Sequence, residues 1–359
     1  MDLEKYIQEI GDINQEASEK ALNHWDSLTH PIGSLGMLEK LTIQLAGIQG
    51  KTIPEIKKKS VIVMCADNGI FDEDISSSPQ EFTQMLANAM VNGSTGVCSI
   101  AGYAKSDVTV VDIGMLHTMD LDNRILNYNI RQSTNNFYKE DAMTREEAIK
   151  AIQVGIQVAE DKIKEGVNIF GTGELGIANT TTSSAVLHAL TKIPAEDCVG
   201  LGAGITDSQL EKKTRVVFEG VRERIKEDDD VIDILAKVGG LDIAGLVGVY
   251  LAGAKNHVPI VMDGIISSVA ALAAVKLNDK VRNYIFPSHL SRESAAPKLF
   301  EYLELKPLVS LGMRLGEGSG CPFTFLILET GIHCMNNMGS LDKTEIDPNV
   351  QVNIRSKDE

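Results

Sequence analysis

Short apolar runs alternate with longer stretches of helical periodicity through the middle of the chain. Seven of these runs are rich in β-branched residues and nearly continuous in apolarity, which is typical of parallel strands covered on both faces. The predicted strands are Ser60–Met64, Val108–Val111, Val167–Phe170, Cys198–Leu201, Val258–Met262, Tyr284–Phe286 and Leu308–Leu311. The pattern therefore predicts an α/β fold with a doubly wound, mainly parallel, Rossmann-like sheet.

Helical patterns lie between the predicted strands. Thr144 and Glu147 have the spacing of a capping box and predict the start of one helix. The polar, Asn-rich connection between Met115 and Ala142 is too long for a simple turn and indicates a functional excursion. The predicted helices are Thr83–Ala101, Arg145–Lys164, Thr180–Leu190, Ser208–Ile225, Leu241–Ala254, Ile265–Lys276 and Glu293–Leu303.

The two ends of the chain follow a different pattern. Residues 1–50 and 320–340 predict helices with no strand between them, and the last 20 residues are polar and predict an irregular tail. We expect residues 1–50 and 320–359 to form a small helical domain. Residues 51–319 are expected to form a large α/β catalytic domain.

Composition narrows the class of protein. The chain has 359 residues, of which 43% are hydrophobic, and a formal net charge of −16, which argues against nucleic-acid binding. No apolar run reaches the length of a membrane span, and the charged start Met1–Lys5 does not have the pattern of a signal peptide. The five cysteines are scattered and never in C-x-x-C spacing, which disfavours a disulfide framework or a zinc site. We therefore expect a cytoplasmic small-molecule enzyme.

Polar and glycine residues gather where the predicted strands end. In open parallel sheets, ligands bind outside the carboxyl ends of the strands. These ends read Asp67-Asn68-Gly69, Asp112-Ile113-Gly114, Gly171–Gly176, Gly202-Ala203-Gly204, Asp263-Gly264, Ser288-His289 and Gly316-Glu317-Gly318. Taken singly, some of these are plain turns, but together they predict an active-site cleft at this edge of the sheet.

Glu317 is the most informative of these residues because it is an acid with glycine on both sides at a predicted strand end. A backbone without neighbouring side chains lets a carboxylate approach a ligand closely. The alternative is a glycine-rich turn whose acid faces solvent.

The segment Gly171–Gly176 matches G-x-G-x-x-G after a predicted strand and before a predicted helix. One interpretation is an NAD-dependent oxidoreductase with the pyrophosphate at the helix N-terminus. However, Glu196 and Asp197, which could serve as the ribose acid, precede the next predicted strand, whereas that acid normally follows it. The helix begins with a hydroxyl-rich turn, which suits a single phosphate or another polar ligand.

Several motifs in order resemble those of nicotinate-nucleotide–dimethylbenzimidazole phosphoribosyltransferases, which activate the lower-ligand base of cobamides. The resemblance covers residues 20–335. Its motifs are Leu28-Thr29-His30-Pro31-Ile32-Gly33-Ser34-Leu35-Gly36, Ala66-Asp67-Asn68-Gly69, Ser78-Pro79-Gln80-Glu81-Phe82-Thr83, Gly173-Glu174-Leu175-Gly176-Ile177-Ala178-Asn179-Thr180-Thr181, Gly239-Gly240-Leu241-Asp242-Ile243-Ala244, Val261-Met262-Asp263-Gly264 and Leu315-Gly316-Glu317-Gly318-Ser319-Gly320.

The resemblance implies transfer of phosphoribose from nicotinate mononucleotide to an aromatic base, with release of nicotinate and inversion from β to α. The pyridinium leaving group is already cationic, so neither a metal nor a general acid is needed, and the resemblance implies no cofactor. Glu317 matches the family's catalytic glutamate and is the candidate general base, and Glu174 matches a second acid. If the two carboxyl groups approach each other, one pKa should rise toward neutrality.

The resemblance also implies a substrate-binding set. For the 5′-phosphate, the candidates are backbone amides around Gly173, Gly176 and Gly204 with Lys213 as counter-charge. Alternatively, Lys213 lies on a solvated helix face. The full set is Ser78, Leu86, Gly173, Leu175, Gly176, Asn179, Thr180, Gly204, Lys213, Asp263, Gly264, Ser291, Leu315 and Gly316.

The chain departs from the family pattern at three places. Asn68 stands where the family often has histidine, and Glu293-Ser294-Ala295-Ala296 replaces a usual Glu-Pro-Gly-His. Leu86 stands where many members have a glutamine against the base. Either Leu86 only packs in a helix, or the base pocket is drier and accepts phenols such as cresol. We also expect a homodimer or a heterodimer with a paralogue, and a regulatory paralogue subunit is a further alternative.

Overall fold

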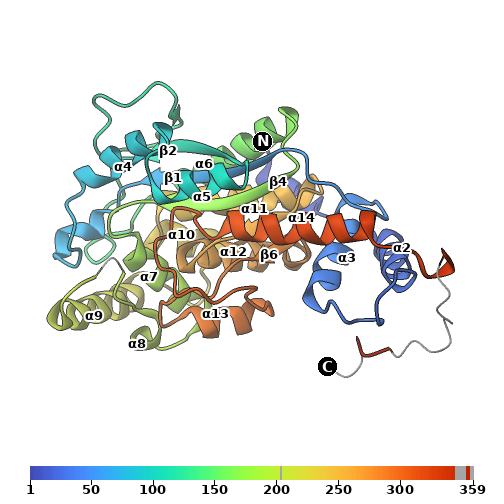
Figure 1. The fold of residues 1–359 in the computed structure, drawn as a ribbon. Coiled ribbons are helices and arrows are strands. Elements are labelled where there is room, and N and C mark those ends of the chain that lie inside the picture. Colours follow the sequence, from blue (N-terminus) through green and yellow to red (C-terminus); the bar gives the residue numbers. More distant parts are fainter. Residues whose placement is uncertain (203, 344–352, 356–359) are drawn as a thin grey trace.

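The centre of the molecule is a parallel sheet of six strands (Figure 1). The computed structural model describes residues 1–202, 204–343 and 353–355. The strands are β1 (Lys59–Ala66), β2 (Asp107–Gly114), β3 (Leu126–Asn127), β4 (Ile169–Leu175), β5 (Ile260–Met262) and β6 (Ile285–Pro287). Their spatial order is β3-β2-β1-β4-β5-β6, and every neighbouring pair is parallel. The predicted doubly wound α/β sheet is confirmed.

Helices connect and cover the strands. They are α1 (Leu3–Gln8), α2 (Gln15–Asp26), α3 (Met37–Gln49), α4 (Glu81–Val91), α5 (Gly96–Tyr103), α6 (Arg145–Lys164), α7 (Asn179–Thr191), α8 (Ala195–Cys198), α9 (Asp207–Arg224), α10 (Val231–Val238), α11 (Leu241–Lys255), α12 (Ile265–Leu277), α13 (Ala296–Leu303) and α14 (Cys321–Asn337), with short 3₁₀ turns at Gly69–Glu73, Asp279–Tyr284 and Leu341–Lys343. The capping box of Thr144 and Glu147 is present, and α6 has the predicted bounds. The helix predicted over Thr83–Ala101 is divided into α4 and α5, because Gly93 between them has a left-handed φ of 73°.

Two predicted strands are wrong. Cys198–Leu201 begins at the last residue of α8, and the carbonyls of Cys198 and Val199 accept from the hydroxyls of Ser184 and Ser294 instead of from a neighbouring strand. Its apolar residues reflect burial and not strand pairing. Leu308–Leu311 makes only an isolated parallel bridge, between Val309 and His289 beyond the end of β6. β3 is an addition of two residues inside the connection 115–142, too short to give a periodic signal.

Both faces of the sheet are covered, as the continuous apolar runs predicted. On β4, Gly171 faces Cys321 at the start of α14, and α14 crosses in front of the sheet in Figure 1. The next residue, Thr172, points to the other face, where its hydroxyl bonds with Tyr250 of α11 and Ser267 of α12. Since successive side chains of a strand alternate between faces, each strand contributes to two packed layers.

Helices α6 and α11 cross at a contact made of glycines. A Cβ on Gly248 would lie 2.0 Å from the carbonyl oxygen of Ile152, and one on Gly155 would lie 1.9 Å from the carbonyl oxygen of Gly245. The two backbones therefore touch directly, which seats α11 deep against the sheet. All residues of α11 from Leu241 to Ala254 are buried.

The chain ends meet around Trp25. A second hydrophobic cluster, separate from the main core, joins α2 and α3 to the end of α14. It contains Ala21, Trp25, Leu28, Ala46 and Met335. In contrast, Leu3, Tyr6 and Ile10 belong to the main core. The division into a domain of residues 1–50 with 320–359 and a domain of residues 51–319 stays a prediction. Much of the expected irregular tail falls on residues 344–352 and 356–359, outside the described residues.

The helix crossing gives a prediction about stability. Gly248→Ala should lower the free energy of unfolding by about 1–3 kcal/mol, because a methyl group would force the α6 and α11 backbones apart. Urea denaturation followed by circular dichroism measures this. Gly102→Ala in α5 is the control: nothing lies within 4 Å of its added Cβ, so it should be neutral or stabilise by up to about 1 kcal/mol. Equal midpoints for the two variants would contradict the close contact.

Candidate functional site

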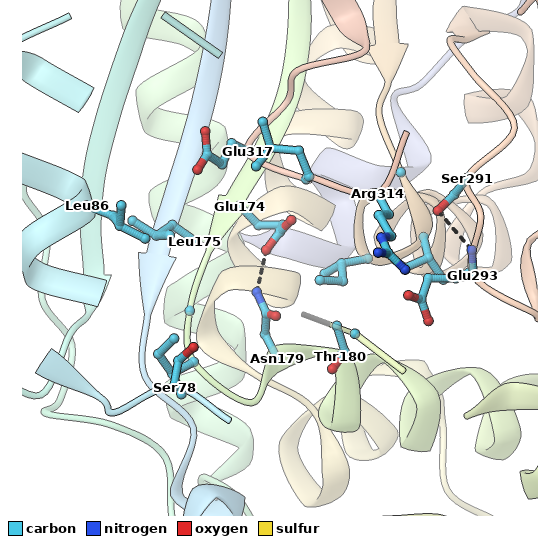
Figure 2. Close-up of a pocket in the computed structure, with 18 of the residues that line it drawn as sticks. Ser78, Leu86, Glu174, Leu175, Asn179, Thr180, Ser291, Glu293, Arg314 and Glu317 are labelled. Carbon is cyan, nitrogen blue, oxygen red and sulfur yellow. Dashed lines mark hydrogen bonds between the residues drawn. The ribbon is translucent and has the colours of Figure 1, made fainter. Parts of the chain in front are cut away.

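A cavity of about 270 Å³ opens at the carboxyl ends of the strands. The strand order reverses between β1 and β4, and in such sheets this switch point is where ligands bind. Figure 2 shows Glu317 and Leu86 on one side, Ser291, Glu293 and Arg314 on the other, and Glu174 with Asn179 between them. The cavity is lined by Ser78, Phe82, Leu86, Glu174, Leu175, Gly176, Ile177, Asn179, Thr180, Gly202, Gly264, Ile265, Ile266, His289, Ser291, Glu293, Arg314, Leu315, Gly316 and Glu317.

The structure brings most of the predicted site residues to this cavity. Of the residues predicted from the sequence, Gly173, Gly204, Lys213 and Asp263 do not line it. Lys213 lines a neighbouring hollow of about 80 Å³, which also includes Ser78, Gly176, Asn179 and Thr180. Gly204 is exposed, and nothing lies within 4 Å of the position that an added Cβ would take. Gly173 and Asp263 lie beneath the segment that carries Glu317.

Glu317 is held in a strained backbone conformation close to a helix start. Its φ is 62°, a left-handed value that a residue with a side chain rarely adopts, and only 8% of the residue is exposed. The Oε2 atom accepts from the backbone N–H of Val97, in the first turn of α5, at 3.5 Å. Burial raises the pKa of the Glu317 carboxyl above its ordinary value, and the N–H of Val97 offsets part of this.

Two buried groups fix the segment that carries Glu317. Asp263, at the end of β5, accepts from the N–H of Gly318 at 3.0 Å and from the N–H of Gly320 at 2.7 Å. From β4, a Cβ on Gly173 would lie 2.5 Å from the carbonyl oxygen of Glu317, so the glycine allows this segment to pass over the strand. Asp263 therefore positions Glu317 without reaching the cavity.

Glu174 is a buried acid of the cavity lining. Asn179 donates to its Oε2 atom, and the backbone N–H of Glu317 also donates to its carboxyl group. Burial, followed by the charges of Asp242 and Asp263, raises the pKa of Glu174 to about 8. The expected rise toward neutrality is present, but the neighbouring acids that cause it are Asp242 and Asp263. Figure 2 shows the carboxylates of Glu174 and Glu317 pointing in different directions.

Lys213 is a buried cation, 1% exposed, so it does not lie on a solvated helix face. Its Nζ atom donates to Thr180 Oγ1 at 2.9 Å and to the carbonyl oxygen of Gly200 at 3.1 Å. Burial lowers the pKa of Lys213 to about 8, and the charge of Glu293 offsets part of this. A buried ammonium group is costly to leave without a counter-charge.

The packing around position 176 requires a glycine, whether or not a ligand binds there. A Cβ there would lie 2.0 Å from the carbonyl oxygen of Ala66 at the end of β1, so this glycine allows β4 to leave the sheet beside β1. A bulky substitution at Gly176 would therefore disturb the fold itself, in addition to any approach of a ligand.

Some residues of the cavity lining were not in the predicted catalytic and substrate-binding set. They are Phe82, Ile177, Gly202, Ile265, Ile266, His289, Glu293 and Arg314. His289, Gly202 and Glu293 lay in segments already recognised, so proximity to the strand ends could have found them. Burial lowers the pKa of His289, and the ring faces Ser288 Oγ at 3.1 Å. Nothing in the local pattern of Phe82 or Arg314 marks it as facing a cavity.

Comparisons with known proteins identify the family. A family model described as "Phosphoribosyltransferase" matches residues 10–346. The chain belongs to this family. It is 45% identical over 356 residues to a nicotinate-nucleotide–dimethylbenzimidazole phosphoribosyltransferase of Clostridium tetani, covering 99% of this chain and 98% of that one. A protein of the same name from Acetivibrio thermocellus is 44% identical over 336 residues, 94% of this chain and 95% of its own.

Solved structures agree with this assignment. The chain is similar to the crystal structure of CobT from Thermus thermophilus, with a TM-score of 0.89, 32% identity, and coverage of 92% of this chain and 99% of that one. The predicted family and reaction class are confirmed, and this phosphoribosyltransferase is a pentosyltransferase. An NAD-dependent oxidoreductase is not favoured. Among the helices that the structure describes, none is long and apolar enough to cross a membrane.

The anchoring role of Asp263 can be tested. Asp263→Asn removes one acceptor and turns an amide donor toward the N–H of Gly318 or Gly320. The free energy of unfolding should fall by about 1.5–3 kcal/mol, because the variant leaves a buried N–H without its charged partner. Urea denaturation at pH 7.5 measures the change, with the exposed Asp279→Asn as control. Unchanged stability would mean that Asp263 does not anchor this segment.

Proposed function

We propose that this phosphoribosyltransferase moves phosphoribose from nicotinate mononucleotide to an aromatic lower-ligand base in cobamide biosynthesis. The C1′–N bond to nicotinate breaks, its electron pair returns to the pyridine ring, and a new C1′–N or C1′–O bond forms on the opposite face. The main support is the pair of adjoining hollows, which share Ser78, Gly176, Ile177, Asn179, Thr180 and Gly202. One nucleotide can place its phosphate in the small hollow and its aromatic ring in the large one.

Glu317 is proposed as the general base. It lines the cavity, its backbone is fixed by Asp263, and the N–H of Val97 holds one carboxylate oxygen. The other oxygen is available to take the proton of the attacking base. A raised pKa improves this transfer because it brings the acidity of the carboxyl closer to that of the incoming nucleophile.

Glu174 is proposed as the second acid of the site. With a pKa of about 8, it is neutral at pH 7 while Glu317 is able to act as a base. A neutral Glu174 also avoids a second negative charge beside a substrate that carries a phosphate. The two carboxyl groups then have separate roles.

The phosphate subsite is proposed around Lys213, Thr180, Gly176 and Gly202. Lys213 has no carboxylate within ion-pair distance among the residues that the structure describes, so a ligand phosphate can supply its counter-charge. Ser291 is also buried at the cavity wall, and its Oγ lies 3.4 Å from the N–H of Glu293.

The identity of the base rests on the wall next to Glu317. Leu86, Leu175 and Leu315 are apolar members of the cavity lining, and Leu86 also packs against the main core. We propose that this wall favours an apolar ring such as a cresol relative to a benzimidazole. A phenol with a pKa near 10 is about 4–6 units above a carboxyl, or roughly 5–8 kcal/mol, so proton transfer must accompany formation of the C–O bond.

A dimer is proposed as the working form, either with a second copy or with a paralogue. Phe82 and Leu315 at the cavity mouth are 41% and 53% exposed, which supports cover by another chain. Light scattering measures the mass. A cytoplasmic location is likewise a proposal, supported by five free cysteines. A purely regulatory subunit is less well supported, because Glu317 and its anchoring residues are all present.

The proposed reaction is tested by incubating the protein with nicotinate mononucleotide and a panel of 5,6-dimethylbenzimidazole, adenine, phenol and cresol. Mass spectrometry should detect nicotinate and an α-riboside 5′-phosphate. No product with any base, from folded protein alone or mixed with its paralogue, would refute the proposal.

Glu317→Gln should lower kcat by about 10²–10⁴-fold, because the amide keeps the shape of the side chain but cannot accept a proton. Nucleotide binding, measured by calorimetry, should remain. A variant that keeps more than a tenth of the rate with every base would show that Glu317 is not the general base.

Lys213 should make nucleotide affinity depend on pH. Since its pKa is about 8, the charged form is lost as the pH rises, and the Kd for nicotinate mononucleotide should be about tenfold weaker at pH 9 than at pH 7. Lys213→Gln should bind about 10–100-fold more weakly at pH 7 and lose this dependence. Lys212→Gln, which removes a neighbouring charge outside both hollows, should behave as the parent does. Equal effects of the two substitutions would argue against a phosphate at Lys213.

Leu86→Gln should shift the ratio of rates toward benzimidazole by about tenfold, because an amide at the wall offers a partner to a polar ring edge. Competition between dimethylbenzimidazole and cresol measures the ratio. Met85→Gln on the same helix, outside the cavity lining, is the control. An unchanged ratio for an active Leu86→Gln would mean that Leu86 only packs.

A further inference from the structure

Three buried oxygen atoms converge beside Gly240, behind the cavity. A Cβ on Gly240 would lie 2.4 Å from Asp242 Oδ1, 2.7 Å from Asn68 Oδ1 and 3.5 Å from Thr182 Oγ1. Asp242, Asn68 and Thr182 are all 0% exposed. Within the described part of the chain, neither Asp242 Oδ1 nor Asn68 Oδ1 has a hydrogen-bond partner.

The two neighbouring side chains donate hydrogen bonds to other groups. Asn68 donates through Nδ2 to the carbonyl oxygen of Ile177 at 3.3 Å, which fixes the orientation of its amide. Thr182 donates its hydroxyl hydrogen to the carbonyl oxygen of Asn179 at 2.9 Å. If Asp242 were ionised, only acceptors would face one another at a position closed to solvent, which is unfavourable.

We propose that Asp242 is held as the neutral acid, that its Oδ1 hydroxyl donates to Asn68 Oδ1, and that this proton makes Asp242 a positioning residue for Glu174. One hydrogen then satisfies both unpartnered oxygens. The positioning role toward Glu174 rests on the proposed function. The protonation of Asp242 does not, because it is independent of the reaction that the site catalyses.

The second oxygen of Asp242 links it to the cavity. Asp242 Oδ2 accepts from Asn179 Nδ2 at 3.2 Å, and the same nitrogen donates to Glu174 Oε2. An amide nitrogen carries two hydrogens, so one Asn179 side chain serves both acids. With Asp242 fixed by Asn68, the orientation of Asn179 is also fixed, and Asn179 in turn holds the Glu174 carboxyl.

The electrostatic surroundings agree with a neutral Asp242. Burial raises the pKa of Asp242 to about 7, and the charge of Asp67 adds to the rise. The ionisable groups that face it are acids from two strands: Asp67 and Cys65 at the end of β1, and Glu174 on β4. Hydrogen bonds from Asn179 and from the first turn of α11 offset part of this rise.

Asp263 is a second buried aspartate with which Asp242 can be compared. Burial raises its pKa to about 7 as well, and both aspartates are at most 2% exposed. However, Asp263 faces the N–H groups of Gly318 and Gly320, which stabilise a carboxylate, whereas Asp242 Oδ1 faces an acceptor. Replacement by asparagine should therefore have opposite effects at the two positions.

The test compares Asp242→Asn, Asp242→Ala and Asp263→Asn in the full-length protein. Asparagine at 242 supplies an N–H donor in place of the acid hydroxyl, so Asp242→Asn should fold and should lose a protonated-carboxyl band from the infrared spectrum at pH 6. Asp263→Asn should keep the particular band that Asp242→Asn removes. Asp242→Ala should lower kcat at least tenfold, and Asp242→Asn should restore most of the loss.

Unfolding supplies a readout that needs no substrate. The pKa of Asp242 is higher in the folded state than in the unfolded chain. Between about pH 4 and pH 7, the folded state therefore keeps a proton that the unfolded chain has already lost. In this range, the unfolding constant of the parent should rise with pH more steeply than that of Asp242→Asn. The difference between the two should be up to tenfold for each pH unit. The proposal would be overturned if Asp242→Asn kept the infrared band. It would also be overturned if Asp242→Asn had the parent's pH dependence of unfolding and lost as much kcat as Asp242→Ala. Absence of phosphoribosyl transfer would refute the proposed function but leave the infrared and unfolding tests valid.

Discussion

The site depends on one buried interaction, the contact of the Asp263 carboxylate with the N–H groups of Gly318 and Gly320. These two bonds hold the segment that carries Glu317, just before α14, above the end of β4. They support Glu317 in a left-handed conformation, which needs compensation from the surrounding structure. Gly173 makes the arrangement possible from below, because any side chain there would displace the Glu317 carbonyl.

The electrostatics at this edge of the sheet are unusual for a site that is proposed to bind a phosphate. Raised pKa values reduce the negative charge that an anionic substrate meets. Lys213, with a pKa lowered by burial, gives the opposite charge at the adjoining hollow. The close crossing of α6 and α11 brings the first turn of α11, with Asp242, against β1 and β4, so the helix layer behind the sheet contributes to the wall of the site. The aspartates and glutamates whose pKa values burial raises are Asp67, Asp112, Glu174, Asp242, Asp263 and Glu317.

The sequence by itself determined the elements whose signals are local. The capping box of Thr144 and Glu147 set the start of α6, and the continuous apolar runs indicated a parallel sheet covered on both faces. Glycine and acid at the strand ends indicated the edge where the cavity lies, because all strands of a parallel sheet end on the same side. The ordered motifs indicated the family, since many positions had to agree together.

Only the tertiary structure decided features that depend on contacts between distant segments. Cys198–Leu201 has the composition of a strand, but serine hydroxyls satisfy its carbonyls and no strand pairs with it. Gly176 is required by the carbonyl of Ala66. Burial raises the pKa of Glu174, and the charges of Asp242 and Asp263, which come from other elements, add to the rise. Local sequence patterns record burial and turns but not which atom faces which. For this reason, the chain alone showed where a site would form, and the packing of its strands and helices decided the protonation and orientation of the groups within it.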